Sequence, residues 1–234
     1  MKKIILSTAL ALASITTMSA QDFFSTDTPE KLFTFGARIG LNTSNRTVNS
    51  SMVSIWNVNS WGTGFDAGAV ADLNIRDFIT IQPGFFYESR SGSYAYQSYA
   101  YNLSDADNYD VVKTQVGKGR EYFFTIPVMG IVHFNVLEDL RWNVEFGPYF
   151  QIKLKSTFDG KFSYPQVAHD GDIYYSKDTK TTKCDVGLKM GTSLDICEHY
   201  YVGVHYLAGM LRAWNPAQLG GRNKAWLFTI GYNF

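Results

Sequence analysis

Large apolar residues alternate with small or polar residues in eight segments of the chain. The last segment, residues 226–234, reads WLFTIGYNF, and every second residue from Trp226 to Phe234 is large and apolar. Successive side chains of a β-strand point to opposite faces, so this period of two predicts a strand with one apolar face. The same pattern predicts strands over residues 33–42, 64–73, 78–88, 122–134, 140–154, 184–196 and 200–210. No segment of helical period competes with them for the core.

The connections between these segments alternate in length. Residues 74–77, 133–139 and 197–199 form short connections, and long polar ones fall around residues 44–63, 90–119, 156–182 and 211–224. Short turns at one end and long loops at the other are typical of outer-membrane barrels. A strand of about ten residues crosses the hydrocarbon when tilted by about 45°. The prediction is an all-β, eight-stranded antiparallel transmembrane β-barrel with short periplasmic turns and four long extracellular loops.

Alternation alone also fits a soluble, lipocalin-like barrel with an apolar interior, so the content of the polar face decides between the two. That face is rich in glycine and carries charges of both signs. Small residues relieve crowding inside a narrow barrel, and charges enclosed there can pair with one another. We therefore predict an interior polar network made of Arg38, Asp66, Asp72, Glu88, Arg141, Glu145, Lys153, Asp185, Lys189 and His205.

The opposite face carries aromatic residues at the predicted strand ends, where the two interfaces of a bilayer favour them. We expect a periplasmic girdle of Phe35, Phe134, Trp142, Tyr200, Tyr232 and Phe234, and an outer girdle of Phe65, Tyr87, Tyr122, Phe150 and Trp226. Three prolines fall inside strands, where each removes a ladder hydrogen bond. We expect bulges near Pro83, Pro127 and Pro148.

The two ends of the chain carry signals of their own. Residues 1–20 combine Lys2 and Lys3 with a short apolar run and small residues, which is the layout of a secretory signal peptide. We expect a short periplasmic segment over residues 21–32 and the barrel over residues 33–234. A chain that ends on phenylalanine resembles the signal by which outer-membrane barrels are recognised, so Tyr232 and Phe234 predict contact with the barrel-assembly machinery.

The charge balance argues against a nucleic-acid partner, and the cysteine spacing argues against a disulfide. The chain has 21 basic and 21 acidic residues, and loss of Lys2 and Lys3 with the signal leaves a small acidic excess. Such a balance argues against nucleic acid as a partner. Cys184 and Cys197 bracket one predicted strand and would lie about 40 Å apart, beyond the reach of a disulfide. We expect two free thiols.

Seven segments together resemble the PorT-like family of small outer-membrane barrels, common in Bacteroidetes. They are GARIGLN (36–42), GFDAGAVADL (64–73), IQPGFFYE (81–88), TIPV (125–128), FGPYF (146–150), DVGLKMG (185–191) and TIGYNF (229–234). The resemblance implies the barrel fold and, because the family includes a type IX secretion accessory protein, contact with secretion-complex subunits. The chain has His205 where the resemblance implies arginine.

The sequence offers little for chemistry. His133, His169, His199 and His205 are too scattered to predict a metal site by spacing. The acidic stretch DADNYD (105–110) lacks the glycine and the distal glutamate of an EF-hand. We predict no catalytic residue, no metal and no cofactor, and we expect His205 to point into the barrel as a hydrogen-bonded histidine. A rim-sited lipid hydrolase, with His169 and a loop serine, is one alternative function.

The stretch SGSYAYQSYAYN (91–102) places Tyr94, Tyr96, Tyr99 and Tyr101 among serine and alanine. Tyrosine on a loop supplies contact area at low entropic cost, which makes these residues candidate loop contacts. Alternatively, the third and fourth strands extend above the membrane as a hairpin. The leading hypothesis is a non-enzymatic integral barrel that contacts a macromolecule or extracellular ligand through loops or rims. A small-solute porin is another alternative, although eight strands leave little lumen.

Overall fold

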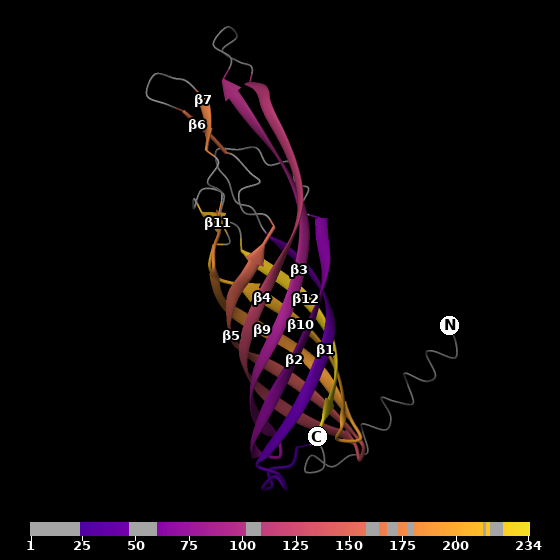
Figure 1. Cartoon of the computed structure of the whole chain (residues 1–234). Helices are drawn as coiled ribbons and strands as arrows, with labels where there is room; N and C mark the ends of the chain where they lie inside the picture. Colours follow the sequence, from indigo (N-terminus) through magenta and orange to yellow (C-terminus); the bar gives the residue numbers. More distant parts are fainter. Residues whose placement is uncertain are drawn as a thin grey trace, which may run out of the picture.

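The computed structural model describes residues 24–46, 60–101, 109–157, 164–167, 173–176, 180–212, 214–215 and 222–234, and the side chains of most of these. Eight long strands close into one barrel in the order β1-β12-β10-β9-β5-β4-β3-β2. Every neighbouring pair is antiparallel, including the closing pair β1 and β12, which confirms the predicted eight-stranded antiparallel barrel (Figure 1). The strands are β1 (Phe33–Arg46), β2 (Ser60–Arg76), β3 (Ile79–Tyr101), β4 (Tyr109–Leu137), β5 (Leu140–Ser156), β9 (Cys184–Ile196), β10 (Tyr200–Gly209) and β12 (Asn223–Asn233).

The connections separate the barrel into two ends. Residues 77–78, 138–139 and 197–199 join strands at what we call the short-turn end, where the C-terminus also lies (Figure 1). The other connections leave the opposite, long-loop end. They hold two small sheets that the sequence did not predict, one of β6 (Tyr164–Val167) with β7 (Ile173–Ser176) and one of β8 (Lys180–Thr181) with β11 (Trp214–Asn215).

The β3–β4 hairpin extends far beyond the barrel. Pairing of β2 with β3 stops at Ser60 and Ser93, whereas β3 and β4 stay paired as far as Tyr101 and Tyr109. The eight residues past Ser93 add about 26 Å at 3.3 Å per residue, and Figure 1 shows the hairpin rising above the other strands. The prediction of a loop over residues 90–119 is therefore wrong for most of that range, and the alternative of an extended hairpin is confirmed.

Burial is inverted relative to a soluble protein, as predicted. The apolar stripes face outward, and Phe35 and Leu41 are 60% and 69% exposed. The polar stripes face inward, and Arg38 and Glu145 are 3% and 2% exposed. The interior is not polar throughout, because Tyr149, Leu207, Ala225 and Leu227 form a buried apolar cluster within it. Only a lipid-facing barrel can leave so much apolar surface on its outside.

Outward aromatic rings gather in two groups. Near the short-turn end, Tyr232 contacts the rings of Tyr200 and Phe234, with centroids 5.6 and 5.5 Å away. Towards the long-loop end, the Tyr87 ring lies 6.0 Å from Tyr122 and 6.1 Å from Phe65. These groups have the arrangement expected of two interfacial girdles.

The three strand prolines are accommodated without bulges, contrary to the sequence prediction. The register is the same on both sides of Pro83 and Pro127 in the β3–β4 and β4–β5 ladders, and Pro148 pairs with Leu188 in an unbroken β5–β9 ladder. Next to Pro83 and Pro127 a few residue pairs of the ladder are not hydrogen-bonded, because proline cannot donate a backbone hydrogen bond. Register shifts occur elsewhere, for example between Trp61 and Phe65.

The segment before β1 packs on the short-turn end. The Phe24 ring lies 4.4 Å from the ring of Phe78. Two backbone hydrogen bonds hold the segment, from Asn74 N to Leu32 O (2.9 Å) and from Asp77 N to Asp27 O (3.1 Å). The predicted signal peptide, residues 1–20, lies outside the described residues.

Candidate functional site

The centre of the barrel holds a hydrogen-bonded cluster around Glu145. This carboxylate accepts from Ser193 Oγ at 2.5 Å, from Tyr201 Oη at 2.9 Å and from His205 Nε2 at 2.8 Å. The four side chains come from β5, β9 and β10, and all are buried. Several donors on one carboxylate satisfy a group that would be costly to enclose alone. His205 thus points inward as a hydrogen-bonded histidine, as the sequence predicted, and it lies beside Tyr201.

A glycine on the intervening strand makes this cluster possible. Gly191 of β9 is the cross-strand partner of Glu145 on one side and of His205 on the other. An added Cβ at Gly191 would lie 2.8 Å from the Cα of His205 and closer still to its ring. Because Gly191 has no side chain, Glu145 and His205 meet across it.

The same arrangement recurs at Gly231 of β12, which pairs with Arg38 of β1 and Tyr201 of β10. The Arg38 guanidinium lies over the Tyr201 ring, 4.1 Å from its centroid, and donates to Asn233 Oδ1 at 2.6 Å. A cation over an aromatic face is attractive, particularly where water is excluded. Two glycines therefore connect the Glu145 cluster to the closing strand pair.

A second cluster lies nearer the long-loop end. Arg90 forms an ion pair with Glu88. Gln151 bridges the cluster to β4 by donating to Thr125 Oγ1 at 2.7 Å. Lys153 Nζ lies 3.9 Å from Glu121 Oε1. Their arrangement fills the lumen with paired charges.

Two further predicted residues complete this region. Asp66 is buried and sits opposite Glu88 in the β2–β3 register. The Lys189 ammonium lies 5.0 Å from the centroid of the Phe86 ring. Each residue thus extends the polar interior towards β2 and β9.

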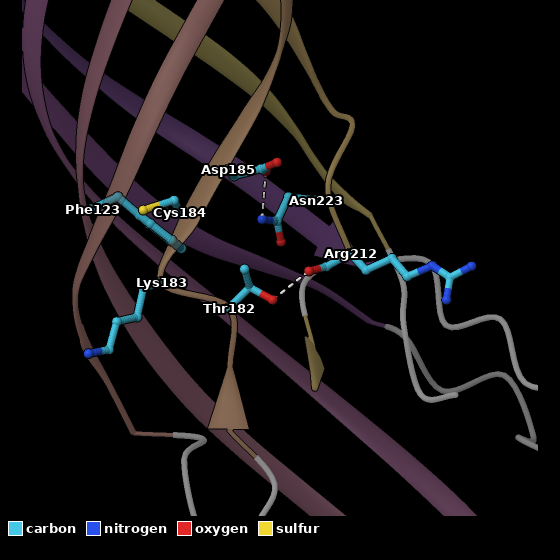
Figure 2. Close-up of a pocket in the computed structure, with 7 residues that line it drawn as sticks. All are labelled: Phe123, Thr182, Lys183, Cys184, Asp185, Arg212 and Asn223. Carbon is cyan, nitrogen blue, oxygen red and sulfur yellow. Dashed lines mark hydrogen bonds between the residues drawn. The ribbon is translucent and has the colours of Figure 1, made fainter. Parts of the chain in front are cut away.

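Asp185 joins three strands near the long-loop rim. Its Oδ2 accepts from Tyr149 Oη at 3.2 Å and from Asn223 Nδ2 at 2.9 Å, and its Oδ1 accepts from Leu211 N at 3.2 Å. Figure 2 shows Asp185 and Asn223 at a small pocket that is also lined by Phe123, Thr182, Lys183, Cys184 and Arg212. The carboxylate binds only internal groups in these three hydrogen bonds, so its role is to hold the neighbouring strands together.

The short-turn half of the interior holds a third hydrogen-bonded group, around His133. The His133 ring bonds Asn143 Oδ1 at 2.7 Å and Thr80 Oγ1 at 2.8 Å. Asp72 accepts from Gln82 Nε2 at 2.6 Å. Arg141 lies apart from this network, at the short-turn rim, where it pairs with Asp77 at 3.2 Å and is 37% exposed.

Nine of the ten residues proposed for the interior network thus lie within the barrel. Sequence reasoning missed several of their partners: Arg90, Glu121, Asn143, Gln151, Ser193 and Tyr201. Arg90 shares the inward parity of Glu88 and was missed because it falls where a loop was expected. The side chains of Tyr94, Tyr96, Tyr99 and Tyr101 lie outside the described part of the structure, although their backbone belongs to β3.

The geometry suits structural pairing better than catalysis. Ser193 and His205 both bind Glu145, so the Ser193 hydroxyl donates to the carboxylate and not to the imidazole that would activate it in a serine hydrolase. Within the described ranges, no group of three or more His, Cys, Asp and Glu is arranged to hold a metal. Cys184 and Cys197 are free, as predicted, and both are exposed. His169 and most of the acidic stretch 105–110 lie outside the described residues.

Residues 19–211 match the family described as outer membrane protein beta-barrel domain. The chain belongs to this family. Its place is therefore the outer membrane of a Gram-negative bacterium, as predicted. No curated protein gives a significant match.

Similar solved structures include three outer-membrane proteins. OprG of Pseudomonas aeruginosa is 11% identical, with a TM-score of 0.44 over 87% of this chain and 97% of that one. Ail of Yersinia pestis is 11% identical, with a TM-score of 0.42 over 87% and 100%. Neisserial surface protein A is 12% identical, with a TM-score of 0.41 over 85% and 95%.

Proposed function

We propose that the protein is a non-enzymatic integral barrel that contacts another macromolecule through its long-loop end, which faces the outside of the cell. The observation that carries this proposal is the β3–β4 hairpin. It continues past its last barrel partners, Ser60 on β2 and Ser156 on β5, as a two-stranded arm. An arm built on two barrel strands presents its residues at a fixed distance from the membrane, which favours recognition over a purely structural role.

The filled interior supports contact over transport. Buried charges, the Glu145 cluster and the apolar cluster of Tyr149, Leu207, Ala225 and Leu227 occupy the lumen. An eight-stranded barrel has an interior only wide enough for side chains. A solute would have to displace paired charges to pass, so the rims and the arm are the surfaces available for function.

The most specific form of the proposal names the partner. We propose that it is a subunit of a type IX secretion complex, and that the protein is a PorT-like accessory barrel of a Bacteroidetes cell. The support is the set of seven resembling segments, which includes FGPYF (146–150) and DVGLKMG (185–191). Both segments lie on neighbouring barrel strands, β5 and β9. The proposed contact is made by the arm, outside this shared barrel.

Deleting residues 94–117 and closing the hairpin with Asn-Gly between Ser93 and Lys118 tests the arm. The barrel ladders of β2 with β3 and of β4 with β5 stay complete in this variant, so it should fold. A control variant shortens a different long connection by removing residues 164–176. Each is captured from native outer membranes in mild detergent by a tag placed after Ala20, and co-purifying proteins are identified.

We expect a stoichiometric partner with the wild type and with the control, and its loss with the arm deletion. Secretion subunits among the partners would support the accessory role. A different partner would support only the general proposal, that the long-loop end contacts another macromolecule. Retention of the partner by the arm deletion, or a barrel that purifies alone in every case, would overturn it.

A further inference from the structure

Asp66, inside the barrel, is a buried carboxylate whose charge is not compensated by a bonded neighbour. Its side chain is 2% exposed, and neither oxygen accepts a hydrogen bond from a described residue. The other buried acids of the described chain all have partners: Glu88 pairs with Arg90, Glu121 with Lys153 and Glu145 with His205, and Asp185 accepts three hydrogen bonds. Enclosing a carboxylate is costly unless another group compensates its charge. Asp66 therefore requires a partner that the described side chains do not supply.

Asn42 on β1 carries a second unpartnered oxygen. Its side chain is also 2% exposed, and its Oδ1 has no hydrogen-bond partner among the described residues. Asn42 Nδ2 donates to Ser89 O at 3.1 Å. This bond fixes the direction of the amide, because the reverse orientation would place two acceptors against each other. Oδ1 is therefore a buried acceptor without a donor.

The register of β1 and β2 brings these two side chains together over two glycines. Gly40 pairs with Asp66, and Asn42 pairs with Gly64, so the four positions form a block on neighbouring strands with glycine at two opposite corners. We call these four residues the Asp66 block. A Cβ added at Gly40 would lie 2.7 Å from Asp66 Oδ2, and one added at Gly64 would lie 2.7 Å from Asn42 Oδ1. Each oxygen thus lies in the space that its cross-strand glycine leaves free.

A β-bulge in the next ladder orients Asn42. The register of β2 with β3 shifts between Trp61 and Phe65, where residues 62–64 of β2 face residues 90–91 of β3. A Cβ added at Gly64 would clash with Ser89 O, the acceptor of the Asn42 amide. Bulges are common next to functional sites, where they redirect nearby groups. The bulge therefore brings the Ser89 carbonyl to the Asp66 block and turns Asn42 Oδ1 away from it.

We propose that Asp66 and Asn42 bind a sodium ion inside the barrel. Hard cations take carboxylate and amide-carbonyl oxygens as ligands, and water can complete their coordination. One positive charge neutralises the one carboxylate of the block, whereas a divalent ion would leave a charge uncompensated in a buried site. The sequence gave no sign of this site, because it has one carboxylate where metal motifs have several acids or histidines.

The bound ion ties β1 to β2 below the base of the arm. Asp66 is six residues from Ser60, the last residue of β2 that pairs with β3. Its neighbour in the register, Glu88, is held by Arg90 and is not free to bind a second cation. The inference concerns the barrel interior, so it is independent of any protein partner of the arm.

Sodium NMR of the full chain in detergent tests the site, because the sodium signal broadens when the ion exchanges with a protein. Choline chloride keeps the ionic strength constant while sodium is varied. Asp66→Asn removes the charge and keeps the size of the side chain. Asp72→Asn is the matched control, because it removes an interior carboxylate that already accepts from Gln82. Urea unfolding of the same proteins in sodium or choline chloride measures whether the ion stabilises the fold.

We expect the wild type and Asp72→Asn to broaden the sodium signal, and Asp66→Asn to reduce this broadening several-fold. The urea midpoint of the wild type should rise with sodium and then level off, as for a ligand that binds only the folded state. A third variant, Asn42→Asp, places two carboxylates in the block. It should bind Ca²⁺ at least about tenfold more tightly than the wild type, since affinity for Ca²⁺ follows ligand charge.

Equal broadening by Asp66→Asn and the wild type would overturn the proposal. A wild-type urea midpoint that is the same in sodium and in choline would also overturn it. If the midpoint instead rises only on acidification, a proton neutralises Asp66 and the sodium assignment is wrong. Should Asp66→Asn fail to fold, Asn42→Asp decides alone, because an unchanged affinity for Ca²⁺ would show that the two side chains do not share a ligand.

Discussion

His205 Nε2 lies 2.8 Å from Glu145 Oε2, and the two side chains meet across Gly191, which is the cross-strand partner of both. The contact joins β5 and β10, which are not neighbours in the barrel, across β9, the strand between them. Arg38 and Tyr201 repeat the arrangement across Gly231. The interior is thus held by contacts that the backbone ladder does not supply.

Replacing Glu145 with alanine should strongly destabilise the barrel. The change leaves the hydroxyls of Ser193 and Tyr201 and the ring of His205 without their shared acceptor in an interior that excludes water. Loss of one partner from a buried charged cluster costs about 3–5 kcal/mol. Urea unfolding in phospholipid vesicles, followed by tryptophan fluorescence, measures the free energy of unfolding.

The control for this variant is Glu138→Ala, because Glu138 is exposed in the turn between β4 and β5. It should change the free energy of unfolding by no more than about 0.5 kcal/mol. Combining Glu145→Ala with His205→Ala should cost less than the two single changes added together, since they share an interaction. Additive losses would show that the Glu145 and His205 contact contributes nothing of its own.

Adding one methyl group at Gly191 should also destabilise the barrel. An alanine Cβ there would lie 2.8 Å from the Cα of His205, so the ring and its bond to Glu145 must shift. Overpacking of this kind costs about 1–3 kcal/mol. Gly92→Ala is the matched control, because an added Cβ at Gly92 meets nothing within 4 Å. The same urea titration should separate the two, and equal effects would contradict the role given to Gly191.

The positions of the barrel strands could be predicted from this sequence, because a lipid-facing strand must be apolar on alternate residues. The stripe from Trp226 to Phe234 and its seven counterparts are therefore visible without structure. The inward parity of Arg38, Glu145 and His205 follows from the same alternation. The prediction had one physical source, the requirement that one face meets lipid and the other does not.

Strand length above the membrane could not be predicted in this way. Past Ser93, the β3–β4 hairpin is no longer a barrel wall, so no lipid constrains its composition. Its large residues do not keep a single alternating phase, because Tyr94 and Tyr96 are one residue out of step with Tyr99 and Tyr101. The pairing of interior residues was equally hidden. Glu145 and His205 are 60 residues apart and meet only because β5, β9 and β10 take one particular register. A shift by two residues would preserve every stripe and change every partner.

The lumen should not conduct ions steadily. Its cross-section is occupied by the Glu145 cluster and by the apolar cluster that includes Tyr149 and Leu207. Purified protein in planar bilayers should show no stable, step-like conductance. Tyr149→Ala combined with Leu207→Ala removes bulk from the apolar cluster and should raise leak currents, which shows that the assay can detect an opening. Step-like conductance from the wild type would contradict a filled lumen.

Phe234 should matter more for assembly than for stability. Its ring is 68% exposed on the outside of the barrel, in edge-on contact with Tyr232 at 5.5 Å, and its backbone N donates to Phe35 O at 2.8 Å. Phe234→Ser keeps that backbone bond and removes a lipid-facing ring. Phe33→Ser, at the start of β1, is the matched control, because its ring is 59% exposed at the same end. The two changes should lower the free energy of unfolding of purified protein by similar amounts.

If the terminal aromatics are recognised by the assembly machinery, only Phe234→Ser should reduce the amount of folded protein in the outer membrane of cells several-fold. Equal yields of the two variants in cells would show that the terminal ring is ordinary lipid-facing surface.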